Sequence, residues 1–161
     1  MQNTARGVRW VKPGRMHLTL AFLGEVDGDF VASAKRGLSD GVRESVPFSV
    51  RLDGFGAFPN PGRARVIWVG VDEGRDALCR LQKLIVKELR KIGYRPERRP
   101  FSPHLTLGRL RVPADVSGVC ACLFQSDEFL VDRVALYESV LRPQGPEYTR
   151  LAESAFRGKP S

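Results

Sequence analysis

Cysteine is scarce in this chain, and its pattern argues against two structural classes. The 161 residues contain three cysteines, Cys79, Cys120 and Cys122. This odd number, without the spacing of a disulfide framework, argues against a small disulfide-stapled scaffold and agrees with a reducing compartment. Cys120 and Cys122 have no further ligands near them in the sequence, because both histidines lie elsewhere. We therefore expect packed small residues there rather than a zinc site.

Long apolar runs and a signal sequence are also missing. No stretch approaches the roughly 20 apolar residues that span a bilayer, and the opening residues MQNTAR have no apolar signal core. The phosphate-cradling pattern Gly-x-x-x-x-Gly-Lys-Ser/Thr does not occur, so the use of ATP is not indicated. A cytoplasmic protein is the expectation that follows.

Acidic residues are outnumbered by basic ones. The chain has 26 Lys and Arg against 18 Asp and Glu, a formal net charge of +8. This excess favours a polyanionic partner such as nucleic acid. Twenty of the basic residues are arginine, a bias that a GC-rich genome also produces. Charge alone therefore does not decide the function.

Length and periodicity predict one α+β domain. With 161 residues, 42% of them hydrophobic, the chain can bury a core of its own. Apolar spacing predicts helices over residues 27–44 and 75–92 and, more weakly, 114–123. Alternating or continuous apolar runs predict strands over residues 8–11, 17–23, 48–52, 66–71, 103–110, 129–141 and 148–156. The glycine-rich stretch 54–62 is expected to form a bend.

The only two histidines open the same tetrapeptide. His-Leu-Thr-Leu occurs at residues 17–20 and again at 104–107. Alternate side chains of a strand point to opposite faces, so each copy presents a His and a Thr on one face and two leucines on the other. Imidazole transfers protons near neutral pH, and a threonine hydroxyl donates to an oxyanion without adding charge. The two motifs indicate a metal-free acid/base site for phosphate-ester chemistry.

The repeated motif also suggests an internal duplication. Its copies start 87 positions apart, a little over half the chain. Each copy is followed by a predicted helix and further strands. We expect a single bilobal domain over residues 1–161, with two lobes of mainly antiparallel sheet related by an approximate two-fold. Outer helices would cover the lobes, and one motif strand from each would line a central cleft.

Segments around the motifs carry a family resemblance. They include Arg-Trp-Val-Lys-Pro at residues 9–13, Phe-Leu-Gly-Glu-Val at 22–26, Gly-Ala-Phe-Pro at 56–59, Arg-Val-Ile-Trp-Val-Gly-Val at 65–71 and Phe-Ser-Pro-His at 101–104. With the paired motifs, they resemble the two-histidine (2H) phosphoesterases, and within them the RNA 2′,3′-cyclic phosphodiesterases, also called 2′-5′ RNA ligases. Members usually carry an extra strand and helix ahead of the Arg-Trp-Val segment. Those elements are expected to be absent here, which would expose a sheet edge.

The resemblance implies an activity and a role for five residues. It implies hydrolysis of RNA 2′,3′-cyclic phosphate ends to 2′-phosphate ends, reversible 2′-5′ ligation, and no metal or cofactor. The partner would be RNA with such ends, tRNA fragments being one candidate. His17 would be the proton donor and His104 the acceptor, although the residues alone do not assign these roles. Thr19 and Thr106 would hold the non-bridging oxygens, and Arg109 would add charge at the transition state.

Arg109 conflicts with strand parity. It lies an odd number of positions from His104, so a regular strand would point it to the opposite face. A bulge near Gly108, or the length of the side chain, would bring the guanidinium to the motif face.

Two further groups of residues have two interpretations each. Arg95, Arg98 and Arg99 are candidates for binding the phosphates of an RNA strand. As an isolated run of charge they are equally well explained as solvated surface residues. Phe58 and Trp68 are candidates for stacking on a base, although the apolar run around Trp68 favours a place in the core.

Two alternative functions stay open. The substrate could be a small cyclic nucleotide phosphate, in which case an oligonucleotide would have no advantage. The chain could also be a non-catalytic RNA-binding module, as the charge of +8 allows. Such a module would bind in a salt-sensitive way, indifferent to both histidines.

Overall fold

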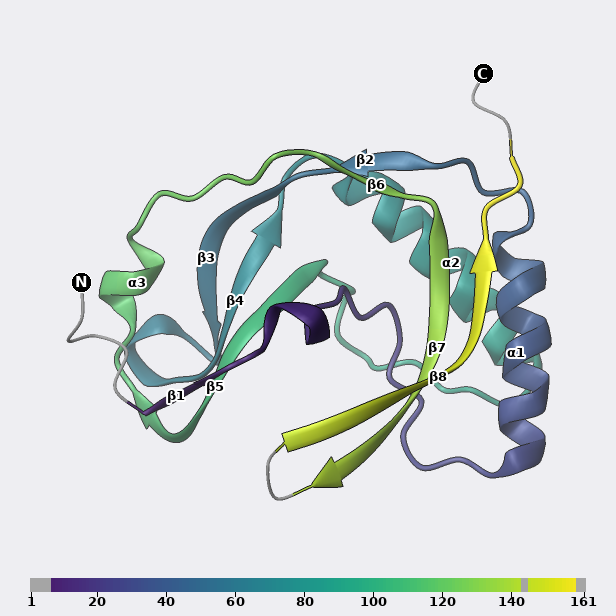
Figure 1. The fold of residues 1–161 in the computed structure, drawn as a ribbon, viewed down its shortest axis with the longest axis horizontal. Coiled ribbons are helices and arrows are strands. Elements are labelled where there is room, and N and C mark those ends of the chain that lie inside the picture. The colour runs from purple at the N-terminus through teal and green to yellow at the C-terminus, as the bar shows by residue number, and fades with distance from the viewer. Residues whose placement is uncertain (1–6, 143–144, 159–161) are drawn as a thin grey trace. The chain divides into compact units, whose positions relative to one another are not determined.

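A computed structural model describes residues 7–142 and 145–158 (Figure 1). Its contacts divide the chain into two compact units. Unit 1 combines residues 1–19, 49–75 and 102–129, and unit 2 combines residues 20–48, 76–101 and 130–161. The pairings within the four-stranded sheet and within the long hairpin are antiparallel, which confirms the predicted α+β class with mainly antiparallel sheet. The single bilobal domain stays a prediction.

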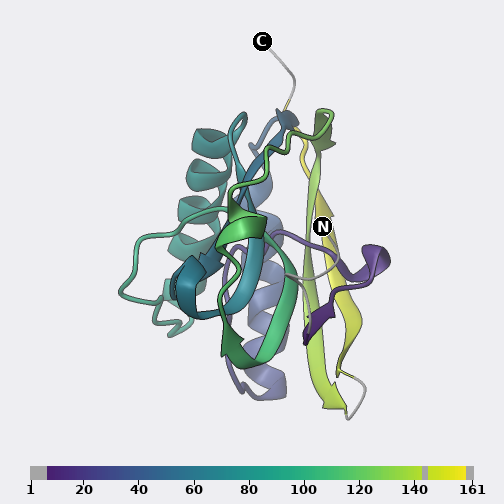
Figure 2. The same cartoon turned by 90° about the vertical axis from the view of Figure 1, so that its left-hand side faces the viewer.

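Unit 1 contains a four-stranded sheet. Its strand order is β1 (Val8–Trp10), β5 (His104–Ala114), β4 (Ala64–Val71) and β3 (Leu52–Phe58). The short helix α3 (Ser117–Cys120) and the 3-10 turns η1 (Pro13–Arg15) and η2 (Pro61–Arg63) connect to these strands. The curvature of β3, β4 and β5 is visible in Figure 2, where α3 lies in front of them.

The sheet of unit 1 has one apolar face. Along β4, Ile67, Val69 and Val71 are buried and alternate with Trp68 and Gly70 on the other face. A core cluster forms on the buried side from Ala57, Ala64, Ile67, Leu110 and Val116. The core of unit 1 therefore lies on one face of the sheet, and Trp68 lies on the other.

The glycine-rich stretch is not the bend that we expected, because β3 runs through its first half as far as Phe58. Gly54 has a φ of +65° and lies at a register shift between β3 and β4. At Gly56 a Cβ would come 2.2 Å from the Trp68 ring. These glycines therefore admit a bulge and a close ring contact within a strand, and the turn is confined to η2 and its flanks.

Unit 2 is built on two helices and a hairpin. The helices are α1 (Gly28–Val42) and α2 (Arg75–Lys91), whose first residue belongs to unit 1, and the hairpin pairs β7 (Arg133–Arg142) with β8 (Gly145–Ala155). Asp27 caps α1 by accepting a hydrogen bond of 2.8 Å from the Phe30 amide. The core combines Ala34, Leu38, Val42, Leu81, Ile85, Leu89, Val134 and Phe156. A two-stranded sheet pairs β2 (Phe48–Val50) with β6 (Phe129–Val131), and each of these strands has residues assigned to both units.

The two long helices are confirmed with small changes at their ends, but three predicted elements differ. The strand over residues 17–23 is wrong: only Leu18 forms a bridge, with Leu105. Leu20, Ala21 and Leu23 instead pack against the core of unit 2. The helix over residues 114–123 is reduced to α3, and the strand over 129–141 is divided into β6 and β7. No helix of the described residues is long and apolar enough to cross a membrane.

Candidate active site

The second motif lies on β5, in the interior of the sheet of unit 1. Across the β4–β5 pairing, His104 is opposite Gly70, Thr106 is opposite Trp68 and Leu105 is opposite Val69. Directly opposed residues of a sheet share a face. His104 and Thr106 therefore lie on the face away from the core, and Leu105 lies on the core side with Val69. This is the alternation that the tetrapeptide predicts.

The first motif joins β5 through one bridge, on the edge that faces away from β4. Leu18 is opposite Leu105 in antiparallel orientation. That register sets His17 opposite Thr106 and Thr19 opposite His104, on the face that Leu18 does not occupy. Opposed Cβ atoms in such pairs are roughly 4.5–5.5 Å apart, and diagonal neighbours such as the two histidines roughly 7–8 Å. The register therefore brings the four residues together on one face of unit 1.

Both His-x-Thr triplets belong to unit 1. The duplicated motif instead predicts that each lobe supplies one motif strand. The difference arises because the Leu18–Leu105 bridge ties the first triplet to β5, whereas the chain enters unit 2 only at Leu20.

The two imidazoles have the same local anchor. His17 Nδ1 lies 2.8 Å from the Arg15 carbonyl oxygen, and His104 Nδ1 lies 2.8 Å from the Ser102 carbonyl oxygen. A carbonyl only accepts hydrogen bonds, so Nδ1 of each ring carries a proton and donates it. Nε2 is then the position at which each ring gains or loses a proton. The residue two positions before each histidine thus fixes which nitrogen is available for chemistry.

Two aromatic side chains contact His104. The Phe58 ring centroid lies 5.2 Å from that of His104 at an interplanar angle of 82°, and the Trp68 centroid lies 5.9 Å away at 56°. Trp68 is half-buried and on the motif face, so its expected place in the core is wrong. Its Nε1 is buried without a partner among the described residues. The signals that could have indicated this place are Gly56, above which the indole lies, and Gly70.

Arg109 lies on the motif face because β5 carries a bulge. Ile67 is opposite Gly108 and Trp68 is opposite Thr106, so Leu107 has no opposite residue on β4. Beyond this bulge Arg109 is opposite Val66, which shares the face of Trp68. Strand parity therefore does not point Arg109 away from the motif face, because β5 carries the bulge that was allowed for near Gly108.

Gly108 fits the close approach of β1 at this bulge. A Cβ at Gly108 would come 2.6 Å from the Val8 side chain and 3.1 Å from the Trp10 ring. The β1 residues lie on the same edge of β5 as Leu18, and the Val11 amide donates to the Leu107 carbonyl at 2.7 Å. The segment between β1 and Leu18, which includes η1, leaves this edge of β5, and the chain returns to it at Leu18.

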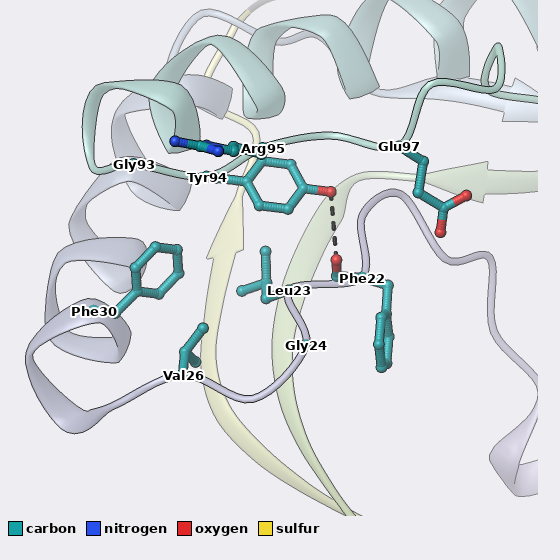
Figure 3. A pocket seen from close by; sticks show the side chains of 9 residues that line it. All are labelled: Phe22, Leu23, Gly24, Val26, Phe30, Gly93, Tyr94, Arg95 and Glu97. Carbon is teal, nitrogen blue, oxygen red and sulfur yellow. Dashed lines mark hydrogen bonds between the residues drawn. The ribbon is translucent and has the colours of Figure 1, made fainter.

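Arg95, Arg98 and Arg99 belong to unit 2, whereas both motifs belong to unit 1. Arg95 lines a hollow of about 390 Å³ whose other lining residues are Phe22, Leu23, Gly24, Val26, Phe30, Gly93, Tyr94 and Glu97 (Figure 3). There the Tyr94 hydroxyl donates to the Phe22 carbonyl at 3.4 Å. Burial, with a smaller contribution from Glu97, raises the pKa of Tyr94 above its ordinary value.

The cysteines are free thiols, and Cys79, Cys120 and Cys122 are all half-buried. Burial, together with the charge of Asp115, raises the pKa of Cys120. Within residues 7–142 and 145–158, no three His, Cys, Asp or Glu side chains form a cluster that could hold a metal ion.

Comparison with known proteins identifies the family. The sequence profile described as "2'-5' RNA ligase superfamily" matches residues 5–142. A protein of Archaeoglobus fulgidus named RNA 2′,3′-cyclic phosphodiesterase is 37% identical over 148 residues, which cover 90% of this chain and 82% of that protein. One of Thermotoga maritima with the same name is 38% identical over 154 residues, covering 94% and 81%.

Solved structures agree with this assignment. The crystal structure of TT0787 of Thermus thermophilus has a TM-score of 0.83 and 30% identity, and the match covers 98% of this chain and 86% of that one. The structure of Escherichia coli LigT complexed with 3′-AMP has a TM-score of 0.76 and 26% identity, covering 94% and 83%. The predicted resemblance is thus confirmed, and the chain belongs to the 2′-5′ RNA ligase superfamily.

Proposed function

We propose that the chain hydrolyses RNA 2′,3′-cyclic phosphate ends to 2′-phosphate ends by metal-independent acid/base catalysis. One observation carries the proposal: the Leu18–Leu105 bridge sets His17 and Thr19 beside Thr106 and His104 on one face of unit 1. The relatives named RNA 2′,3′-cyclic phosphodiesterase support it as the activity of this superfamily.

The two histidines divide the proton transfers. A water oxygen attacks phosphorus in line with the ribose O3′, a new P–O bond forms, and the P–O3′ bond breaks. His104 Nε2 takes the proton of the attacking water, and His17 Nε2 gives a proton to O3′, which leaves as a hydroxyl. One ring therefore starts neutral and the other protonated, and a bell-shaped dependence of kcat/KM on pH follows. The phosphate remains on O2′.

The other three residues act on the charge of the phosphate. Thr19 and Thr106 donate their hydroxyl hydrogens to the non-bridging oxygens, where negative charge is concentrated in the pentacoordinate transition state. Arg109 adds a positive charge from the same face of β5. Because each threonine is opposite the histidine of the other motif, a phosphate held by both hydroxyls is flanked by both imidazoles.

The same groups also support 2′-5′ ligation. If the hydroxyl at the 5′ end of a second RNA replaces water as the attacking group, the same proton transfers produce a 2′-5′ phosphodiester and a free O3′ hydroxyl. Cytoplasmic RNA ends, with tRNA fragments as one candidate, are the substrates that we propose.

An assay with excess EDTA tests the proposal. An oligonucleotide ending in a 2′,3′-cyclic phosphate is incubated with the protein, and the product end is mapped with enzymes that distinguish 2′- from 3′-phosphates. We expect a 2′-phosphate end and no effect of EDTA. Full turnover by His17→Ala or His104→Ala, with folding checked by circular dichroism, would refute the mechanism. Binding of RNA without turnover by the unmodified protein would favour the RNA-binding module.

A further inference from the structure

Arg9 and Arg109 lie directly opposite each other on β1 and β5. On either side of Arg9, Val8 is opposite Leu110 and Trp10 is opposite Gly108. Val8 and Leu110 pack into the core of unit 1. Alternation along β1 therefore places Arg9 on the other face, which is the face of Arg109, Thr106 and His104.

Within the described part of the chain, these two arginines have no acidic partner. All 18 Asp and Glu of the chain lie within the described residues. Among those residues, none forms a salt bridge with Arg9 or Arg109. Like charges at opposed positions of a sheet destabilise it, and an anion bound between them would relieve the repulsion. Arg51, by contrast, faces Asp72, Glu73 and Glu128.

The separation from the motifs leaves room for a second phosphate beside the reacting one, on which Arg109 acts in the proposed mechanism. Arg109 follows Thr106 by three residues, one of which is taken up by the bulge, so it lies about 7–10 Å further along β5. Arg9 is beside it on the neighbouring strand. A guanidinium there can bind phosphate oxygens with two parallel hydrogen bonds.

We propose that Arg9 binds a phosphodiester that precedes the cyclic phosphate in the RNA chain, with Arg109 beside it on β5. A cyclic phosphate closes the 3′ end of a strand, so every other phosphate lies on its 5′ side. The inference rests on the proposed function and specifies its substrate class: an oligonucleotide, not a mononucleotide. It also means that residues of unit 1 bind the RNA strand, and not Arg95, Arg98 and Arg99 of unit 2.

Arg9→Gln tests the subsite, with Arg80→Gln as the control. Both residues are exposed and both changes remove one positive charge, but Arg80 lies on α2, in unit 2. Turnover is measured on a trinucleotide and on a mononucleotide, each ending in a 2′,3′-cyclic phosphate, from low to high salt. We expect Arg9→Gln to lower kcat/KM on the trinucleotide about tenfold and its salt slope by about 1. Most of the trinucleotide's advantage over the mononucleotide should disappear, whereas Arg80→Gln should behave like the unmodified protein.

A binding measurement separates this inference from the proposed function. The affinities for a trinucleotide and a mononucleotide that end in a 2′-phosphate are measured by calorimetry for the same three proteins. A selective loss of trinucleotide affinity in Arg9→Gln supports the subsite even if the protein shows no turnover. The subsite is wrong if Arg9→Gln weakens both ligands equally, weakens neither, or matches Arg80→Gln.

Discussion

The two copies of His-Leu-Thr-Leu have the same residues but different support. The second copy begins β5, a strand of eleven residues that is hydrogen-bonded to β1 and β4. The first follows a 3-10 turn and is joined to the sheet by one bridge at Leu18. His17 and Thr19 are exposed, whereas His104 and Thr106 are half-buried.

The two histidines share one local feature despite this difference in backbone support. Each imidazole is fixed by a hydrogen bond to the carbonyl two residues earlier, whether or not the residue lies in a strand. One register contact at Leu18 is sufficient to set both histidines on one face of unit 1. A continuous second strand is not required.

The histidines are expected to matter equally despite their unequal support. His17→Ala and His104→Ala should each lower kcat by about 10²–10⁴-fold, because each removes one of two required proton transfers. The double variant should be little worse than either single one, since both groups act in one step. Single-turnover kinetics on a cyclic-ended oligonucleotide measure these effects. If only one of the two single variants lost activity, the assignment of one required proton transfer to each histidine would be wrong.

The threonines give a finer comparison of the two copies. Thr19→Val and Thr106→Val preserve the side-chain shape and remove only the hydroxyl, so each should lower kcat by about 10²-fold through the loss of an oxyanion donor. The midpoint of thermal unfolding should stay nearly constant for the exposed Thr19. If both variants retain full kcat, the hydroxyls do not hold the phosphate.

The support of the second copy can be disturbed separately. In Gly56→Ala the new methyl group would displace the Trp68 ring that contacts His104. We expect a destabilisation of about 1–3 kcal/mol and a lower kcat. In the control Gly14→Ala, ahead of the first copy, the added methyl meets nothing within 4 Å. Its stability should change by less than about 0.5 kcal/mol. Urea denaturation of both variants measures this difference, and equal effects would contradict the packing account.

The smallest expected effect concerns the segment that follows the first copy. Tyr94→Phe removes the hydrogen bond to the Phe22 carbonyl and should cost at most about 1 kcal/mol. Because folding raises the pKa of Tyr94, the folded state favours its neutral form. The related stability is complete below the unfolded pKa near 10 and is lost as pH rises through the higher folded value. The free energy of unfolding, measured from pH 8 to 11.5, should therefore fall more steeply with pH for the unmodified protein than for Tyr94→Phe.

Some features of the molecule could be predicted from the sequence because their determinants are local. The apolar stripe predicted from Leu78, Leu81, Leu84, Ile85 and Leu89 indicated α2 nearly to its ends, although Leu84 is exposed in the structure. Alternation in the second motif gave the start of β5 and the shared face of His104 and Thr106. Both depend on the periodicity of one element alone.

Other features depend on which segment is the neighbour. Leu18, Leu20 and Phe22 alternate with His17, Thr19 and Ala21 like strand residues. Leu20, Ala21 and Leu23 nevertheless pack against the core of unit 2, so the first motif strand was predicted wrongly. The face of Arg109 depends on a bulge that is defined only by the register between β4 and β5. Trp68 stands in an apolar run, but only the strand pairing shows that it faces His104. Cross-strand register is not contained in a single stretch of sequence.

The most direct test of the account uses the small number of histidines. In protein labelled with 15N, long-range 1H–15N spectra show two imidazoles and no others, because the chain has only two histidines. A nucleoside 2′-monophosphate is then added stepwise. The account predicts that Nδ1 carries the proton in both rings when they are neutral, and that both Nε2 signals shift with one common Kd. Protonation of Nε2 in place of Nδ1 in either neutral ring, or a shift of one imidazole alone, would contradict it.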